Sequence, residues 1–359
     1  MKTLTVDLPG REYDILIGRG LLDAAGERVR AACPRAGRLF VVTDGNVAPL
    51  YLERVEGSLR AAGFETAAAV LPAGEETKCG PMLLTLWERM MDFGLTRADG
   101  VVALGGGVVG DLTGFAAATI LRGVDFVQIP TTLLAQVDSS VGGKVAIDLD
   151  HGKNLAGAFW QPRLVLMDPD ALDTLPLDVF MAGMAEVLKY GCIRDGEFFD
   201  FLAARPSREA LMGEIGHILY TCCDIKRRVV MEDERDTGLR MILNFGHTVG
   251  HAFEKAGRYT EWSHGEAVAA GMCVAARLGA ALGVTPAEVP GKIEAAVAAL
   301  GLPTYISCDW DTIVEAVGLD KKSAGSRISL ILLEKMGRAI PVKMEKEAVL
   351  RTLETVYKR

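Results

Sequence analysis

The sequence lacks several features that would place it in a membrane, outside the cell or on nucleic acid. No apolar run reaches the roughly 18 residues that suggest a membrane span; the stretch 101–120 comes closest, but Asp111 and many glycines interrupt it. The seven cysteines show no CxxC spacing, which favours reduced thiols over a zinc ribbon or a disulfide framework. The net charge of −8 gives no general attraction to nucleic acid or anionic lipid. Because the first residues show no apolar signal core, we expect a cytoplasmic protein.

Histidine is also scarce, and its distribution is informative. Only five histidines occur in 359 residues, and three of them, His247, His251 and His264, fall within eighteen positions. Glu186 lies upstream in a segment with helical periodicity. Neutral imidazole and carboxylate are the ligands expected of a catalytic zinc, which keeps one position open for substrate or water. The sequence therefore predicts a metal site built from these regions.

Spacing alone leaves the choice of metal ligands open. His247 and His251 are four apart, so on a helix they share one face and could hold one zinc, while His264 would then be a capping or core residue. The peptidase motif HExxH is excluded, because Thr248 stands where its glutamate should be. Glycines beside the histidines instead indicate close packing around a shared site: 246, 250 and 265.

The order of the expected elements indicates two domains. Apolar segments bounded by turn residues predict buried strands with helices between them: residues 38–43, 66–71, 100–104, 125–129 and 163–167. Such strands form a parallel sheet covered on both faces. After Pro176 the periodicity is helical to about residue 300, with one small strand expected over 328–333. We therefore expect an α/β, Rossmann-like nucleotide-binding domain over residues 1–176, followed by an all-α or mainly helical metal- and substrate-binding domain over residues 177–359.

A glycine turn follows the third of these strands. Residues 105–110, Gly-Gly-Gly-Val-Val-Gly, match the GxGxxG motif, and we expect a helix from about Asp111. Glycine lets the backbone approach a pyrophosphate, and the helix directs its N–H groups at the anion. A tight strand–helix turn gives the same letters, so the motif alone does not decide between nucleotide binding and packing. Asp44, which ends the first strand, is better placed than Asp125 to bind a ribose.

A second glycine-rich segment, Ser139–Lys144, resembles a Walker loop but does not satisfy that motif. Its first glycine is missing, and Val145 stands where a magnesium-binding hydroxyl is needed. The remaining interpretations of Lys144 are a surface lysine or, beside Asp138, a phosphate ligand.

Several charged residues in the helical half are open to two interpretations. Glu186 and Lys189 share a helix face with Tyr190, and a surface salt bridge is the ordinary interpretation of that spacing. Their neighbours are mostly apolar, however, so the pair is expected to be partly buried and to need a partner or a metal. Other cations and amides are either solvated or suited to a substrate with both carboxylate and phosphate: Lys226, Arg240, Asn244, Lys321 and Lys322.

Seven blocks of the sequence match one known family, in order along the chain: Gly105–Gly114, Pro130–Lys144, Gly152–Asn154, Ala185–Gly191, Gly238–Arg240, Asn244–His251 and His264–Ala267. The chain resembles the 3-dehydroquinate synthases, within the sugar-phosphate cyclase superfamily, over essentially its full length. The resemblance implies an N-terminal nucleotide-binding domain and a helical metal-binding domain. It also implies NAD and zinc as cofactors, with cobalt as a possible substitute for zinc, and a cytoplasmic homodimer.

For the metal, the resemblance implies the ligands Glu186, His247 and His264, and it turns His251 toward the substrate phosphate. Arg122 resembles the arginine that reaches the phosphate pocket of the neighbouring subunit. The implied substrate contacts are Asp138, Lys144, Asn154, Lys189, Lys226, Arg240, Asn244, His251 and one or both of Lys321 and Lys322.

The resemblance also implies a set of NAD contacts. Ala73 departs from the family pattern, in which many members have aspartate before the Gly-Glu pair, and this puts one nucleotide contact in doubt. The implied contacts are Asp44, Gly74, Glu75, Lys78, Gly107, Val108, Val109, Gly110, Asp111, Thr131, Thr132, Lys144, Lys153, Ala171, Leu172, Asp173 and Thr174.

The activity implied is that of a lyase in the shikimate pathway of aromatic amino-acid biosynthesis. It converts 3-deoxy-D-arabino-heptulosonate 7-phosphate to 3-dehydroquinate and phosphate by transient NAD-dependent oxidation, phosphate elimination, reduction and intramolecular aldol cyclisation. The alternatives are an aminodehydroquinate synthase or another sugar-phosphate cyclase, a metal-dependent polyol dehydrogenase, and an inactive NAD-binding regulator. Lys226, Arg240 and Asn244 together favour a carboxylate substrate over the cyclases that act on neutral sugars.

Overall fold

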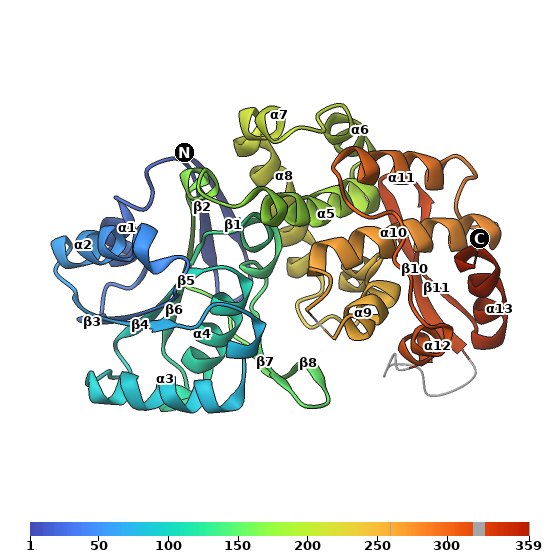
Figure 1. The fold of residues 1–359 in the computed structure, drawn as a ribbon. Coiled ribbons are helices and arrows are strands. Elements are labelled where there is room, and N and C mark those ends of the chain that lie inside the picture. The colour runs from blue at the N-terminus through green and yellow to red at the C-terminus, as the bar shows by residue number, and fades with distance from the viewer. Residues whose placement is uncertain (259, 319–326, 359) are drawn as a thin grey trace. The chain divides into compact units, whose positions relative to one another are not determined.

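The structure is a computed structural model that describes residues 1–258, 260–318 and 327–358 (Figure 1). The chain forms two compact units. The first comprises Met1–Pro176 with Ile215–Arg235, and the second comprises Leu177–Glu214 with Asp236–Arg359. The division into domains after residue 176 stays a prediction, because the first unit also takes in a segment from the helical half of the sequence.

A seven-stranded sheet organises the first unit, in the order β1-β2-β9-β6-β5-β3-β4. Only β1 and β2 pair antiparallel, and the other neighbours are parallel. The five predicted strands are confirmed as β3, β4, β5, β6 and β9, whereas the hairpin β1–β2 was not predicted. The strands are β1 Lys2–Val6, β2 Tyr13–Ile17, β3 Arg38–Asp44, β4 Glu65–Leu71, β5 Gly100–Gly105, β6 Asp125–Pro130 and β9 Leu164–Met167.

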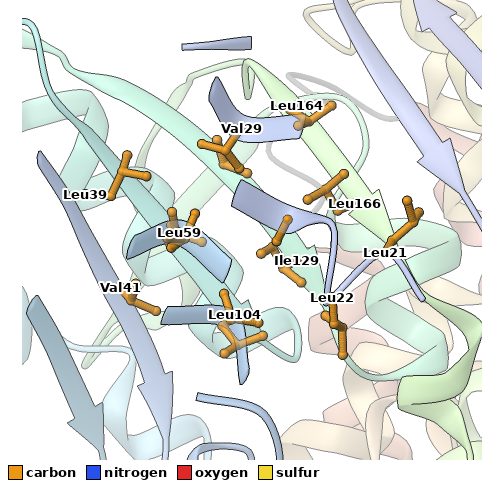
Figure 2. Close-up of a cluster of buried hydrophobic side chains, with 14 of the residues drawn as sticks. Leu21, Leu22, Val29, Leu39, Val41, Leu59, Leu104, Ile129, Leu164 and Leu166 are labelled. Atoms are coloured by element: carbon orange, nitrogen blue, oxygen red, sulfur yellow. The ribbon is translucent and has the colours of Figure 1, made fainter. Parts of the chain in front are cut away.

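Helices cover both faces of this sheet, because its central strands are apolar on both sides. Leu39 and Val41 of β3 belong to one buried cluster, with side chains of α1 (Ala25–Ala32) and α2 (Glu53–Ala61). Figure 2 shows part of this cluster, with Val29 and Leu59 of the two helices among the strand residues. The alternate residues of β3 face the other cluster, with α3 (Gly80–Asp92) and α4 (Gly107–Thr119). The period of two along a strand produces this division.

Two further elements complete the first unit. The strands β7 (Lys144–Leu149) and β8 (Gly152–Phe159) form an antiparallel hairpin. Helix α8 (Ile215–Glu232) lies in the same unit and contacts β1. No helix among the residues that the structure describes is long and apolar enough to cross a membrane.

The second unit is mainly helical, as expected, but it also contains an antiparallel hairpin of β10 and β11. The predicted strand over 328–333 is confirmed as part of β10, where Ile328, Leu330 and Leu332 alternate into a core shared with α9, α10 and α13. The described elements are α5 Leu177–Arg194, α6 Gly196–Ala203, α7 Arg208–Gly213, the 3-10 helix η6 Leu239–Asn244, α9 His247–Ala256, α10 His264–Ala281, α11 Val289–Ala299, α12 Trp310–Gly318, β10 Arg327–Lys335, β11 Arg338–Glu345 and α13 Lys346–Tyr357.

Candidate functional site

A buried ion pair on helix α5 is the centre of the candidate site in the second unit. Glu186 and Lys189 are three residues apart, their side chains are 0% and 1% exposed, and they form a salt bridge. The surface interpretation of this pair is therefore excluded. Carboxylates are almost never buried to this extent without compensating charge or hydrogen bonds. A carboxylate buried among the apolar residues of α5 thus indicates a specific function.

Two imidazoles from other helices meet this carboxylate. His247 begins α9 and His264 begins α10, and the Nε2 atom of each lies 3.4 Å from Oε1 of Glu186. One ligand atom from each of the three residues lies within 4.8 Å of the others. A carboxylate oxygen and two imidazole nitrogens at this separation suit a divalent cation with an open coordination position.

His251 stands beside this cluster without belonging to it. It lies one turn after His247 on α9, is exposed, and its ring centroid is 5.5 Å from that of His247. The His247 and His264 rings are 5.3 Å apart. The structure thus brings together Glu186, His247 and His264, whereas the four-residue spacing had paired His247 with His251.

Helix α10 packs against both α5 and α9 (Figure 1). Glycines let these helices approach closely enough to form the cluster. A Cβ atom on Gly265 would lie 1.9 Å from the backbone oxygen of Ala182 on α5. Gly246 has a φ of +84°, and a Cβ atom there would lie 2.6 Å from Cγ of Met272 on α10. Side chains at these positions would force the helices apart, so the predicted packing role of these two glycines is confirmed.

The second ring nitrogen of each imidazole also faces an acceptor. Nδ1 of His247 lies 3.3 Å from the backbone oxygen of Phe245, and Nδ1 of His264 lies 3.5 Å from Oε1 of Glu254. Burial, together with the Lys189 ammonium, lowers the pKa of His247 to about 3. Burial also disfavours the charged form of His264, but the carboxylates of Glu186 and Glu254 raise its pKa to about 10. The lowered pKa favours the neutral form of His247, whereas the raised pKa favours the protonated form of His264.

Sequence reasoning did not identify Glu254. The sequence feature that could have identified it is its spacing. Glu254 follows His247 by seven residues and so lies on the same face of α9. An acidic residue at that spacing, among apolar neighbours, indicates a partner for the site.

The first unit carries a second group of predicted residues at the carboxyl ends of β3 and β5. These two parallel strands are neighbours, and the chain leaves them toward opposite edges of the sheet. From β3 it continues to β4 on one edge, and from β5 it continues to β6 in the other direction. Ligands of open α/β sheets bind at such a switch point. Asp44 ends β3, where its Oδ1 accepts the backbone N–H groups of Asn46 and Val47 at 2.9 and 3.0 Å. The glycine turn ends β5.

Helix α4 begins at Gly107, so the prediction of a start near Asp111 was wrong by one turn. Two glycines of the motif allow close packing: a Cβ atom on Gly105 would lie 2.7 Å from Cβ of Val109, and one on Gly110 would lie 2.9 Å from Oε1 of Gln128. The turn therefore satisfies the packing interpretation. The first turn of a helix also has N–H groups without partners inside the helix, so the start of α4 is suited to an anion.

A network of opposite charges lies beside this turn. Nζ of Lys78 is 2.9 Å from Glu75, 3.3 Å from Asp111 and 3.7 Å from Asp148, and Lys153 lies 3.4 Å from Glu75. Burial raises the pKa of Asp111 to about 6, although Lys78 opposes the shift. Asp148 of β7 was not predicted, because no motif marks it. This network thus brings together four of the predicted cofactor residues: Glu75, Lys78, Asp111 and Lys153.

The predicted substrate residues of the first unit lie on several elements. Lys226 of α8 donates to the backbone oxygen and to Oδ1 of Asp138 at 2.6 and 2.8 Å. Asn154 adopts a left-handed φ of 56°, and its backbone N–H donates to Asp148 at 2.8 Å. Lys144 begins β7 and is exposed. Arg122 is exposed, and with Leu121 it forms two consecutive left-handed residues, which is a strained backbone arrangement.

The remaining predicted residues are more dispersed. In η6, Arg240 is the second residue and is buried, and Asn244 is the last residue and is exposed. Thr131 and Thr132 follow β6, and Gly74 precedes a short helix at Glu75–Thr77. Residues 171–174 lie at the helical turn Pro169–Leu172, where Tyr51 donates to the backbone oxygen of Ala171 at 3.2 Å. Lys321 and Lys322 lie outside the described residues.

Comparison with known proteins places these sites in a family context. Residues 68–182 match the family model for the N-terminal part of 3-dehydroquinate synthase, and residues 183–323 match the model for its C-terminal part. The chain is 46% identical over 340 residues to a 3-dehydroquinate synthase of Clostridium botulinum, covering 94% of this chain and 97% of that protein.

Solved structures are similar over nearly the whole chain. A 2-deoxy-scyllo-inosose synthase complexed with carbaglucose-6-phosphate, NAD⁺ and Co²⁺ has a TM-score of 0.88 at 25% identity, covering 99% of this chain and 100% of that one. The 2-epi-5-epi-valiolone synthase of Streptomyces hygroscopicus, with NAD⁺ and Zn²⁺ bound, has a TM-score of 0.87 at 28% identity, with 97% of each chain covered.

Proposed function

The chain belongs to the 3-dehydroquinate synthase family, and on this premise we propose that it converts 3-deoxy-D-arabino-heptulosonate 7-phosphate to 3-dehydroquinate and inorganic phosphate. This is a carbon–oxygen lyase reaction, dependent on NAD and a divalent metal. The observation that carries the proposal is the cluster of the buried Glu186 with the partly exposed His247 and His264, which supplies the donors that such a metal needs.

The donor set fits a divalent cation such as Zn²⁺ or Co²⁺. Glu186 would contribute one negative charge, and the two imidazoles would contribute Nε2 lone pairs. The metal, when bound, would coordinate substrate hydroxyls and lower their pKa. Lys189 would stay close to the same carboxylate, where its ammonium can orient a substrate hydroxyl and balance the buried charge.

The first unit would supply the residues that bind NAD. Asp44 would bind a ribose hydroxyl, and the first turn of α4 would bind the pyrophosphate. NAD supplies a reversible hydride acceptor, and the protein supplies its orientation. The salt bridges of Lys78 to Glu75 and Asp148 connect the segment Glu75–Thr77 to β7. The 2-deoxy-scyllo-inosose synthase neighbour, with NAD⁺ bound, supports the assignment.

The substrate carries two anionic groups, and the family correspondence divides the cations and amides between them. Arg240 and Lys226 would bind the carboxylate, with Asn244 beside them. Asp138 and Lys189 would orient hydroxyls. The phosphate would be held by Lys144, Asn154 and His251, and by Arg122 of a second subunit in a homodimer. Charge-assisted hydrogen bonds of this kind both position the substrate and set its specificity.

The activity can be tested with the purified protein, the heptulosonate phosphate, NAD⁺ and Zn²⁺. We expect equimolar release of phosphate and a cyclic dehydroquinate, with no net accumulation of NADH because the hydride is returned. Bulk NADH without phosphate would indicate a dehydrogenase instead. Turnover of glucose 6-phosphate but not of the carboxylate substrate would indicate a different cyclase.

Changing His251 to alanine should leave the metal in place and slow the reaction by about 100-fold, because one charge-assisted contact to the departing phosphate is lost. Metal content by atomic spectroscopy and steady-state kinetics would be measured on the same sample. Loss of the metal from this variant would show that the pairing of His247 with His251 is the correct ligand set.

Changing Arg240 to lysine should raise KM for the heptulosonate phosphate by about 10- to 100-fold. Lysine keeps the charge but cannot form two parallel hydrogen bonds to a carboxylate. Because Arg240 is buried, thermal unfolding must be compared with that of the wild type. An unaltered KM in a stably folded variant would contradict the assignment of Arg240 to the carboxylate.

A further inference from the structure

Glu254 is a buried carboxylate outside the assigned metal, substrate and cofactor residues. It lies on α9, its side chain is 3% exposed, and its Oε1 is 3.5 Å from Nδ1 of His264. A carboxylate is almost never buried to this extent without partners, and an imidazole N–H is one partner within its reach. The contact joins α9 to the first residue of α10, which is the residue that faces Glu186.

The two imidazoles of the cluster are held in the same way. In each ring Nε2 lies 3.4 Å from Glu186, while Nδ1 faces an acceptor on the opposite side. For His247 that acceptor is the backbone oxygen of Phe245, and for His264 it is Glu254. An acceptor at Nδ1 keeps the proton on that nitrogen, which leaves the lone pair of Nε2 available to a cation.

We propose that Glu254 is a positioning residue of the metal site, which accepts the Nδ1–H of His264 and so fixes the tautomer and orientation of that imidazole. This inference rests on the proposed function, because it requires that Glu186, His247 and His264 bind a cation. The two histidines then differ in strength as ligands. His247 is supported by a neutral carbonyl, whereas His264 is supported by an anion that makes its ring a stronger donor.

Metal affinity of the intact protein tests the role of Glu254 without reference to turnover. We compare Glu254→Gln and Glu254→Met with the wild type, titrating Zn²⁺ against a chromogenic chelator. Loss of an outer partner of this kind weakens metal binding about 10- to 100-fold. We expect that loss for methionine, which cannot accept a hydrogen bond, and a smaller loss for glutamine, whose amide oxygen can. Glu266→Gln is the matched control, because Glu266 lies two residues after His264 but hydrogen-bonds Ser263.

A second measurement separates positioning from a purely structural role. The Co²⁺-loaded protein in H₂O should show two strongly shifted, exchangeable imidazole proton signals, and one of them should move or broaden in Glu254→Gln but not in Glu266→Gln. A structural role would lower the unfolding temperature of the metal-free variants while leaving their Zn²⁺ affinity and both signals unchanged, and that result would overturn the proposal. If the methionine variant does not fold, the Zn²⁺ affinity of the glutamine variant decides whether Glu254 positions His264.

The outcomes also separate this inference from the proposed function. A wild-type protein that binds no Zn²⁺ would overturn both. Normal binding by the wild type, with unchanged affinity in the Glu254 variants, would overturn the role of Glu254 alone.

Discussion

Replacing Glu186 with glutamine is expected to weaken Zn²⁺ binding by more than about 100-fold and to reduce turnover at least as strongly. Loss of an outer-sphere partner already costs about 10- to 100-fold, and Glu186 contacts both imidazoles directly. A neutral amide is a poorer zinc ligand than a carboxylate. Metal stoichiometry after dialysis and the rate of phosphate release would be measured on the same sample.

A second variant separates ligation from charge balance at Glu186. Glutamine also removes the counter-ion of the buried Lys189, and breaking a buried ion pair is itself destabilising by about 3–5 kcal/mol. Glu186→Asp keeps the negative charge but withdraws the carboxylate by one methylene. If Glu186 is a ligand, both variants lose metal. If it only neutralises Lys189, the aspartate variant retains metal and activity, and the assignment fails. Asp178→Asn, at the exposed start of α5, serves as the control.

Changing Gly265 to alanine is expected to destabilise the protein by about 3 kcal/mol, at the upper end of the range for overpacked cores. The added Cβ would lie 1.9 Å from the backbone oxygen of Ala182, and a backbone atom of a helix cannot move aside as a flexible side chain can. The first turn of α10 would therefore shift away from α5, taking His264 from Glu186. A displacement of about 1 Å at a catalytic site can cost about 100-fold in rate, so we expect both stability and metal affinity to fall.

Denaturant unfolding and Zn²⁺ titration of the Gly265 variant would be compared with Gly291→Ala. Gly291 lies in α11, in the same unit, and a Cβ atom there meets nothing within 4 Å. Alanine is favoured over glycine in a helix by about 1 kcal/mol, so this control should be as stable as the wild type or more stable. Equal stability of the two variants would show that α5 and α10 are not held together at Gly265.

The elements that could be predicted from sequence are those determined by the local pattern of apolar and polar residues. Apolar runs such as residues 100–104 predict the parallel sheet because both faces of each strand are buried. The hairpin β1–β2 was missed because its strands have only five residues each, and because β1, at the edge of the sheet, has exposed residues among its buried ones. The segment 215–235 was expected in the helical half, and only long-range contacts assign α8 to the first unit.

The metal cluster shows the same limit. A spacing of four identifies residues on one helix face, and it therefore favoured His247 and His251. His264 reaches the cluster from the start of a different helix, and the close helix packing that brings it there depends on Gly246 and Gly265. Resemblance to a family implied the set Glu186, His247 and His264, whose ligand atoms the structure brings together. Glu254 was not identified by either route, because its role depends on a contact between two helices.

The most direct test of the central claim is a crystal structure of the protein loaded with Zn²⁺, with the ion located by its anomalous scattering. We predict a single site, with one carboxylate oxygen of Glu186 and the Nε2 atoms of His247 and His264 at about 2.0–2.2 Å from the ion. An ion bound between His247 and His251, with His264 turned away, would contradict the account.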